Sequence, residues 1–545
     1  MRTLTLWKFV TLVCIGFLAA CDKSDENDYA ESNRSETSDP KVLHRGNLGE
    51  ADSIDPHKAM SSIELRIVGD LFMGLMTENA KGEIILGMAK QWIQSDDGLT
   101  HTFYLQENAA WSDGTSLTAF DFEYGMQRLM DPKTASPLAS FLYDIQNGRA
   151  VNEGKLPLSD LGVAALDDNR LVITLDRPVP HLAWMLSSSA SYPIPRHIVE
   201  DKGSNWIKSE NIVCNGAFCL NEWVPYSFME LEKNQYFYEA EGVALDRVFY
   251  YPTSNPGSEF KRYSNGEFDL SVAVPSMRIK WILENFPEEL HRHPVLSSYH
   301  ILLNIDLDEF SDVRVRKALS LALDRTVLAT KVSQKGMTPT TVHVPPALKL
   351  NREQYVISDH DKPLSERIKI AKSLLAQAGY SQDKPLRFLL QSVNSSDSRR
   401  WAVAMRAMWA EIFVHVEILE MEPATYYNDL QSGAYQAAIS NWTADYPDPY
   451  NFLSMFISDP GTVNFSNWKS LNFDKILQES VEILDREERL KILDQAERLA
   501  LEELAVIPFA FDTSNTLVHE NVRGWEDNAM NIHRSRFLSK EGTTQ

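Results

Sequence analysis

Apolar and polar residues follow two different periods along the chain, and each period predicts one kind of element. The segments 101–105 and 169–175 are rich in β-branched and aromatic residues and are followed by turn residues, which predicts two strands. Thr118, with Asp121 three positions later, marks the start of a helix that we expect to run through Met130. Strands intermixed with helices indicate an α/β protein.

Longer amphipathic helices are expected in the second half of the chain. One begins at Ser311 or Asp312, and another covers about 363–377. Two more are expected at about 473–483 and 486–504. The apolar stripe of the last helix, which we interpret as ordinary core packing, consists of Leu490, Leu493, Ala496, Ala500 and Leu504.

The N-terminus has the pattern of an export signal. Residues 2–8 carry two basic side chains, and the apolar run 9–20 is too short to span a bilayer. Small residues directly precede Cys21, and this arrangement resembles a bacterial lipobox. The resemblance implies that residues 1–20 are a lipoprotein signal peptide and that Cys21 carries the lipid. An ordinary signal peptide with an incidental cysteine is the alternative.

The segment after the signal is expected to be a flexible tether, residues 21–41. It is acidic, rich in Ser and Asn and nearly free of apolar side chains, so it cannot bury enough surface to fold. Asp22 resembles the inner-membrane retention signal of enterobacterial lipoproteins. We therefore expect a lipid-anchored protein on the periplasmic side of a bacterial membrane, with the inner membrane favoured. No later apolar stretch approaches membrane-spanning length.

Composition narrows the classes of protein that fit. The 545 residues are 43% hydrophobic and 10% aromatic, which suffices for a large core in more than one domain. The formal net charge is −23 and becomes more negative once Arg2 and Lys8 are cleaved off. This charge argues against nucleic acid as a partner and against electrostatic adhesion to anionic lipid.

Known catalytic motifs are missing from the chain. It has no Gly-x-Ser-x-Gly elbow, no phosphate-binding loop, no His-Glu-x-x-His and no dinucleotide-binding fingerprint. His291 and His293 could present two metal ligands on one strand face, but the sequence suggests no carboxylate or cysteine partner for them. We therefore expect no catalytic residue, no metal and no cofactor, and a protein that is not an enzyme.

Of the four cysteines, Cys14 lies in the signal peptide and Cys21 is the expected lipid site, which leaves Cys214 and Cys219 in the folded body. In an oxidising compartment these two can pair across a tight turn, because the Asn-Gly dipeptide at 215–216 is a strong hairpin signal. We predict a disulfide. The alternative, a metal-binding pair, lacks a second pair of cysteines.

Several motifs together carry a family resemblance. In chain order they are residues 55–58, 70–75, 111–114, 118–122, 131–137, 215–218, 312–319 with 324–325, and 442–446. In order and spacing they resemble the oligopeptide-binding proteins of ABC importers, solute-binding protein family 5. The resemblance covers nearly the whole mature chain, from about residue 42 to the C-terminus.

This resemblance implies an α/β, bilobed periplasmic-binding-protein fold of the large, three-domain type. The ligand would be enclosed between lobes that close about a two-strand hinge near Tyr299 and Phe511. The segments implied are 42–71, 196–300 and 511–545 for lobe I, 72–195 for an inserted domain II, and 301–510 for lobe III.

The function implied is that of a monomeric solute-binding subunit that captures short peptides and delivers them to an ABC permease in the inner membrane. Asp445 matches the family aspartate that pairs with the peptide α-ammonium. The backbone of Ser440 to Thr443 would pair with the peptide as an added strand, with Trp442 lining the pocket. The ligand-binding residues expected are Ser440, Asn441, Trp442, Thr443 and Asp445. The alternatives are that Asp445 caps the turn before Pro447 and that Trp442 is a core residue.

The sequence departs from the family pattern at the positions that would bind the C-terminal end of the peptide. In an ungapped register, arginines that hold the peptide carboxylate in enterobacterial members fall on Leu430 and Ile439, and a glutamate falls on Met60. Longer peptides, a cell-wall peptide, a metal chelate or haem are therefore alternative ligands. A peptide-sensing receptor and a lipid-anchored hydrolase are alternative functions.

Overall fold

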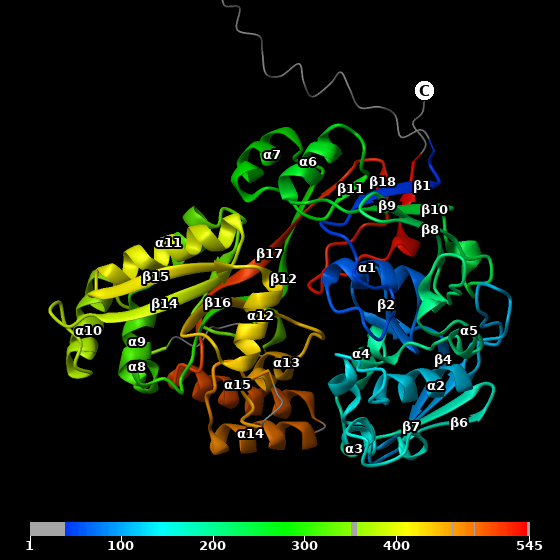
Figure 1. The fold of residues 1–545 in the computed structure, drawn as a ribbon, viewed down its shortest axis with the longest axis horizontal. Helices are drawn as coiled ribbons and strands as arrows, with labels where there is room; N and C mark the ends of the chain where they lie inside the picture. Colours follow the sequence, from blue (N-terminus) through cyan, green and yellow to red (C-terminus); the bar gives the residue numbers. More distant parts are fainter. Residues whose placement is uncertain (1–38, 350–356, 460–462, 484, 542–545) are drawn as a thin grey trace, which may run out of the picture.

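The computed structural model describes residues 39–349, 357–459, 463–483 and 485–541. The predicted signal peptide, Cys21, Asp22 and most of the tether lie outside these residues. The described chain forms two halves (Figure 1). We call residues 39–289 with 519–541 the N-terminal half, and the described part of 304–506 the C-terminal half.

One eleven-stranded sheet extends through both halves. Its order is β15-β14-β16-β12-β17-β11-β1-β10-β9-β8, and β13 pairs with β17. The long strands β12 (Leu290–Leu303) and β17 (Ile507–Val518) are antiparallel and pair from Leu290 with Leu517 to Ile301 with Ile507. Both strands run from one half into the other (Figure 1). The bilobed α/β fold with a two-strand connection is therefore confirmed.

The N-terminal half contains its part of the large sheet and a smaller four-stranded sheet of order β4-β5-β7-β6. Its strands are β1 (Val42–Gly46), β2 (Met76–Glu78), β3 (Ile84–Leu86), β4 (Ala89–Gln94), β5 (Thr100–Leu105), β6 (Val163–Asp167), β7 (Arg170–Thr174), β8 (Phe218–Val224), β9 (Phe228–Lys233), β10 (Arg247–Tyr251), β11 (Leu270–Ser271), β18 (Val522–Arg523) and β19 (Ser539–Lys540). Its helices are α1 (Ser62–Leu71), α2 (Ala119–Met130), α3 (Gly148–Asn152), α4 (Leu182–Met185), α5 (Arg196–Lys202), α6 (Pro256–Ser264) and α7 (Ile279–Asn285).

The C-terminal half packs helices on both faces of its sheet strands (Figure 1). Its strands are β13 (Thr338–Pro339), β14 (Leu386–Val393), β15 (Val414–Met421) and β16 (Ala437–Thr443). Its helices are α8 (Asp308–Ser311), α9 (Val313–Leu321), α10 (Leu364–Gln377), α11 (Ser396–Ala410), α12 (Pro423–Ser432), α13 (Pro449–Leu453), α14 (Leu471–Glu482) and α15 (Arg486–Glu502).

The elements predicted from local pattern are present. Helix α2 starts with a capping box, in which the Thr118 backbone N–H donates to the Asp121 carboxylate over 2.8 Å. Helix α9 starts with Asp312 as its cap, whose carboxylate accepts from the Arg314 backbone N–H over 2.8 Å. Strands β5 and β7, which were expected at 101–105 and 169–175, are neighbours in the smaller sheet.

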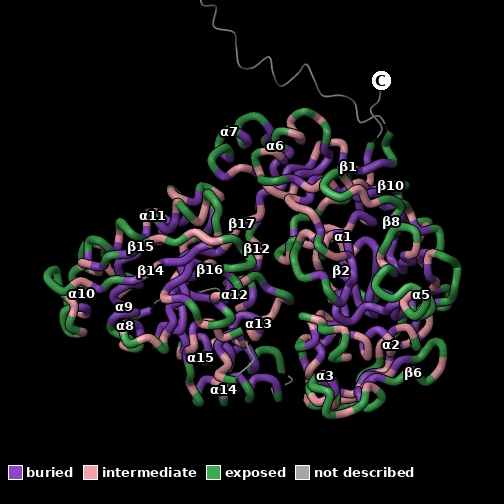
Figure 2. Tube along the Cα trace, viewed as in Figure 1, coloured by how far each residue is buried: buried purple, intermediate pink, exposed green. Residues whose placement is uncertain are grey.

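Each half has a hydrophobic core of its own. Trp111 and Trp206 are buried in the N-terminal half, and Trp401 and Trp409 are buried in the C-terminal half. Figure 2 shows buried segments inside each half. Because the large cores are separate, the angle between the halves can change without repacking either of them.

The structure joins Cys214 and Cys219 by a disulfide, with 5.4 Å between their Cα atoms. The hairpin predicted at residues 215–216 is wrong, because the chain enters β8 only at Phe218 and that strand pairs with β9. The Asn215 side chain instead binds both backbone groups of Met73, accepting from its N–H over 3.2 Å and donating to its carbonyl over 2.8 Å.

Gly216 has a packing role in place of the expected turn role. A Cβ atom at this position would lie 2.5 Å from the Asp70 carbonyl oxygen. The Asn-Gly pair therefore fastens this segment to the end of α1.

Candidate ligand-binding site

The edge of strand β16 forms the framework of the candidate site. On one side β16 pairs with β12 over its whole length, from Ala437 with Leu303 to Thr443 with Ser297. On the other side it pairs with β14 only at Ala437 and Ala438. Within the described residues, no strand pairs with that edge from 439 to 443. The Tyr426 hydroxyl donates to the Ile439 carbonyl over 2.7 Å, so one backbone group of this edge is already bonded.

Asp445 lies two residues beyond the end of β16 and is exposed. Its Oδ2 accepts a hydrogen bond from the Asn451 side-chain amide over 3.2 Å. No Lys, Arg or His of the described chain forms an ion pair with it, and no described backbone N–H donates to its carboxylate. Asp445 therefore does not cap the turn before Pro447, and its Oδ1 is free of hydrogen bonds from described residues.

The electrostatic state of Asp445 follows from these surroundings. The protein around the carboxylate replaces part of its water, and this desolvation raises its pKa above the ordinary aspartate value, while the hydrogen bond from Asn451 acts in the opposite direction. An ionised carboxylate that is partly desolvated and lacks a cation favours a cationic ligand group. A primary ammonium has the charge and the donors to fit it.

Asn451 organises the site and was missed by the sequence analysis. It is buried in α13, only 3% exposed. Its Oδ1 accepts from the Trp442 indole N–H over 2.8 Å and from the Asp445 backbone N–H over 3.3 Å. The signal available in the sequence was weak. Asp448 followed by Pro449 marks a helix start, which places Asn451 in the first turn of that helix.

Helix α13 is itself fixed by a charged pair. The Arg489 guanidinium of α15 donates to both carboxylate oxygens of Asp448, over 2.6 and 2.9 Å, and its side chain is 5% exposed. Asp448 also caps α13 by accepting from the Tyr450 backbone N–H over 2.8 Å. A bidentate, largely buried pair of this kind positions Asn451 firmly.

The other predicted site residues surround this centre. Trp442 is half-buried and packs against the core of the C-terminal half, so it borders both that core and the site. Asn441 and Thr443 are exposed, and the Thr443 hydroxyl donates to Ser297 of β12 over 2.9 Å. Ser440 is half-buried and pairs with His300.

The positions that depart from the family pattern lie in different environments. Leu430 and Ile439 are buried, 2% and 5% exposed, within the apolar cores of the C-terminal half. Met60 is 60% exposed in the N-terminal half.

His291 and His293 contact one carboxylate that the sequence did not suggest, with ring nitrogens 3.1 and 3.3 Å from Asp527 Oδ1. In the described ranges, no group of three or more His, Cys, Asp or Glu side chains is arranged to hold a metal ion.

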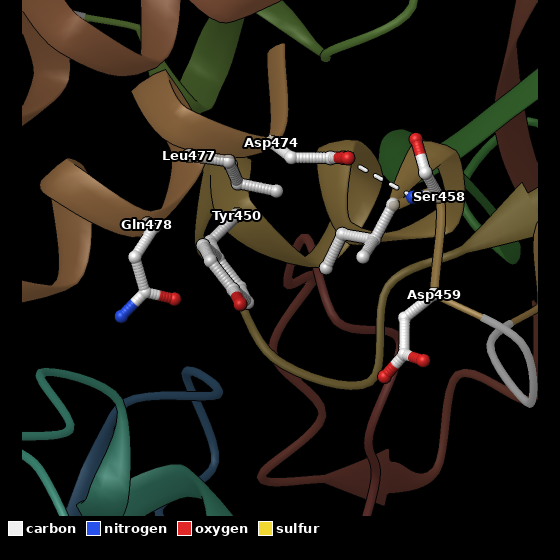
Figure 3. Close-up of a pocket in the computed structure, with 7 residues that line it drawn as sticks. Tyr450, Ser458, Asp459, Asp474, Leu477 and Gln478 are labelled. Atoms are coloured by element: carbon white, nitrogen blue, oxygen red, sulfur yellow. Dashed lines mark hydrogen bonds between the residues drawn. The ribbon is translucent and has the colours of Figure 1, made fainter. Parts of the chain in front are cut away.

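A small cavity lies beside α13, on the side toward the N-terminal half. Its volume is about 360 Å³, and it is lined by Tyr450, Ile457, Ser458, Asp459, Asp474, Leu477 and Gln478. Figure 3 shows Tyr450, Asp459 and Gln478 among the residues that line it, and the hydrogen bond from the Ser458 backbone to Asp474. Arg177 and Arg149 of the N-terminal half contact two of its lining residues, Gln478 and Asp459.

Comparison with known proteins identifies the family. Residues 83–464 match the bacterial extracellular solute-binding proteins, family 5. The chain belongs to this family. The periplasmic oligopeptide-binding protein OppA of Salmonella typhimurium is 35% identical over 494 residues, which cover 89% of this chain and 90% of that protein. Family membership also places this solute-binding protein outside the cytoplasm.

Solved structures of two relatives extend the comparison. Haemophilus influenzae OppA in complex with the peptide RPPGFSPFR has a TM-score of 0.83 at 30% identity, covering 92% of this chain and 99% of that chain. The Escherichia coli murein tripeptide-binding protein MppA has a TM-score of 0.84 at 31% identity, covering 92% and 99%. The unliganded open form of MppA gives a lower TM-score, 0.75, at the same identity and covering 92% and 98%. No helix in the part of the chain that the structure describes is long and apolar enough to cross a membrane.

Proposed function

We propose that this protein is the binding subunit of an ABC importer and that it captures short peptides by their α-ammonium and backbone. The observation that carries the proposal is Asp445, a partly desolvated carboxylate without a described cation partner at the end of a strand edge. The similarity to OppA, whose Haemophilus influenzae form has been solved with a bound peptide, supports the same ligand class.

The proposed binding mode uses the two features that every free peptide has at its N-terminus. The α-ammonium pairs with Asp445, where a charge-assisted hydrogen bond is strong because the site is partly desolvated. The peptide backbone adds a strand along the unpaired edge of β16, from residue 439 to 443. Backbone pairing does not depend on the ligand's side chains, so this mode tolerates many peptide sequences.

The opposite end of the peptide is held differently from the arginine grip of enterobacterial members. Leu430 and Ile439 are apolar and buried, so neither can bind a carboxylate. We propose that ligand length is less strictly fixed at the C-terminal end than at the N-terminal end. Peptides longer than the minimum, or with modified C-termini, are therefore accepted.

The N-terminal sequence supports a lipid anchor, and the family supports an ABC permease as the partner. We propose that the chain is a lipoprotein cleaved before Cys21, that Asp22 favours the inner membrane, and that an ABC permease receives the ligand. The three-part division into lobe I, domain II and lobe III is proposed with the boundaries given above, and the protein is proposed to act as a monomer.

Mass spectrometry of ligand released by denaturation tests this function. Protein purified without added ligand is unfolded, and the small molecules are separated and sequenced. We expect peptides with a free amino terminus and varied C-termini from the unaltered protein, and few or none from Asp445→Asn. Recovery of N-blocked peptides, of a non-peptide ligand, or of the same yield from both proteins would contradict the proposal.

A further inference from the structure

The two halves touch each other just beyond the end of β16, in a contact region that we call the rim. The ring of His181, which directly precedes α4, stacks on Tyr446 with 4.2 Å between ring centroids and 3° between their planes. His181 also stacks on Tyr450, at 5.8 Å and 24°. In Figure 1, α4 of the N-terminal half and α13 of the C-terminal half face each other across this contact.

Polar contacts between the same two surfaces surround this ring pair. Arg177 donates to Gln478 over 3.5 Å and is held by Asp144 of its own half over 2.7 Å. Arg149 lies 3.6 Å from Asp459. Gln478 and Asp459 border the rim cavity shown in Figure 3. The two contacts between the halves, Arg177 with Gln478 and Arg149 with Asp459, are long and partly exposed, so each contributes little by itself. The stacked and buried ring pair is the stronger element of the rim.

The comparison with MppA agrees with a closed arrangement of the halves. At the same 31% identity, the TM-score is 0.84 to one structure of MppA and 0.75 to its unliganded open form. The score of 0.83 to peptide-bound OppA is close to the higher value. Because the identity is equal, sequence divergence does not explain the difference, and this structure superposes less well on the open form of MppA than on its other structure.

We infer that His181 is a positioning residue: by stacking on Tyr446 it holds the two halves closed over the ligand site. The inference rests on the proposed function because Tyr446 directly follows Asp445, the residue proposed to bind the ligand ammonium. A ligand that fixes Asp445 also orders Tyr446, and an ordered Tyr446 presents its ring to His181. Ligand binding and closure therefore favour each other.

The same contact makes closure sensitive to protons. His181 is 8% exposed, and its Nδ1 has no hydrogen-bond partner in the described chain. The charged groups that act on it are Asp448 and Asp144, which favour protonation, and Arg489 and Arg177, which oppose it. Burial is the largest effect and lowers the pKa of His181 to about 4.

The sign of the pH dependence follows from this lowered pKa. Opening exposes the ring and returns it to an ordinary value of about 6.5. Between these two values the open form binds more protons than the closed form, so acidification favours opening. Above pH 6.5 the His181 ring is neutral in both forms, so its titration no longer affects closure.

Distance measurements between the halves test the inference without any ligand. Spin labels at Leu166→Cys and Leu471→Cys, which are 56% and 87% exposed in β6 and at the start of α14, report the separation of the halves. We expect His181→Ala to shift the ligand-free population toward longer distances. His181→Phe, which keeps an aromatic ring, is expected to restore the shorter distances. His415→Ala, on the exposed face of β15, is the matched control and should change neither.

Ligand affinity supplies a second readout. We expect His181→Ala to weaken binding by about 2- to 10-fold, mainly through faster dissociation, because an aromatic pair contributes that much beyond area burial. Between pH 7.5 and 5.5 the unaltered protein should lose up to about tenfold in affinity from this source, and His181→Phe should lose that dependence while staying tight.

The outcomes separate this inference from the proposed function. Unchanged label distances in His181→Ala, or a pH dependence that persists in His181→Phe, would overturn the role of His181 even if peptides bind. If the distances respond as expected but peptides do not bind, the role of His181 in closure stands and the peptide assignment is wrong.

Discussion

The side-chain amide of Asn451 hydrogen-bonds to the carboxylate of Asp445 over 3.2 Å, while its carbonyl oxygen accepts the indole N–H of Trp442. One buried residue of α13 therefore orients two residues that we propose to be in the ligand site. It satisfies only one carboxylate oxygen of Asp445 and supplies no charge. In the proposed function, the α-ammonium of the peptide provides the opposite charge.

Replacing Asp445 by Asn tests the proposed ammonium contact. The substitution keeps the shape but removes the charge, which leaves a bound ammonium poorly compensated. We expect calorimetry to show a loss of affinity for a free peptide of roughly 30-fold to several thousand-fold, about 2 to 5 kcal/mol. The N-acetylated form of the same peptide has no ammonium and should bind the unaltered protein weakly.

The acetylated peptide completes a double-mutant cycle. It should lose much less affinity than the free peptide when Asp445 is replaced. Asp383→Asn, an exposed carboxylate elsewhere in the C-terminal half, is the control and should leave both affinities unchanged. Equal losses for the two peptides would remove Asp445 from the ammonium site.

Asp445→Asn should stabilise the ligand-free protein, although it weakens peptide binding. A pKa raised in the folded protein means that ionised Asp445 destabilises the ligand-free fold at any pH above the ordinary aspartate value. Asp445→Asn should therefore raise the free energy of unfolding at pH 7, by a few tenths to about 1 kcal/mol. The gain should vanish in acid, where Asp445 is protonated in both states. Denaturant unfolding at pH 7 and at pH 3 measures this, and a loss of stability at pH 7 would show that Asp445 is a structural residue.

Removing Asn451 should damage both the fold and the site. Asn451→Ala leaves the partly buried indole N–H of Trp442 without its acceptor and removes a buried side chain, so we expect the free energy of unfolding to fall by about 1 to 3 kcal/mol. Peptide affinity should also fall, but less than in Asp445→Asn, because the charge remains. Asn285→Ala, at the exposed end of α7, serves as the control in the same assays. Unchanged affinity in a folded Asn451→Ala protein would mean that Asp445 needs no orientation by Asn451.

The lipid anchor can be tested by fractionation. If Cys21 carries the lipid, Cys21→Ser should give a product that is not labelled by palmitate and that is recovered in the soluble fraction. Cys14→Ser, inside the apolar run of the signal, should remain labelled and membrane-bound. A Cys21→Ser product that stays with the membrane without palmitate would refute the lipobox interpretation.

Local sequence determined those elements whose signals lie within one or two turns of chain. Thr118 and Asp121 are three residues apart, and the capping box they form needs no distant partner. Asp312 and the 363–377 pattern specified α9 and α10 for the same reason. The ordered family motifs gave the bilobed fold, although hydrophobic periodicity could not have paired β1 with β10 or β12 with β17 across hundreds of residues.

Tertiary structure decided the contacts between residues that are far apart in the sequence. Asn215 and Gly216 have the local signature of a hairpin, yet the approach of α1 assigned them to binding Met73 and to close packing. Likewise, nothing in the sequence around His181 indicates Tyr446, because their stacking depends on how the two halves meet. A turn or cap depends on neighbouring backbone torsions, whereas a contact across the molecule depends on the path of the whole chain between its partners.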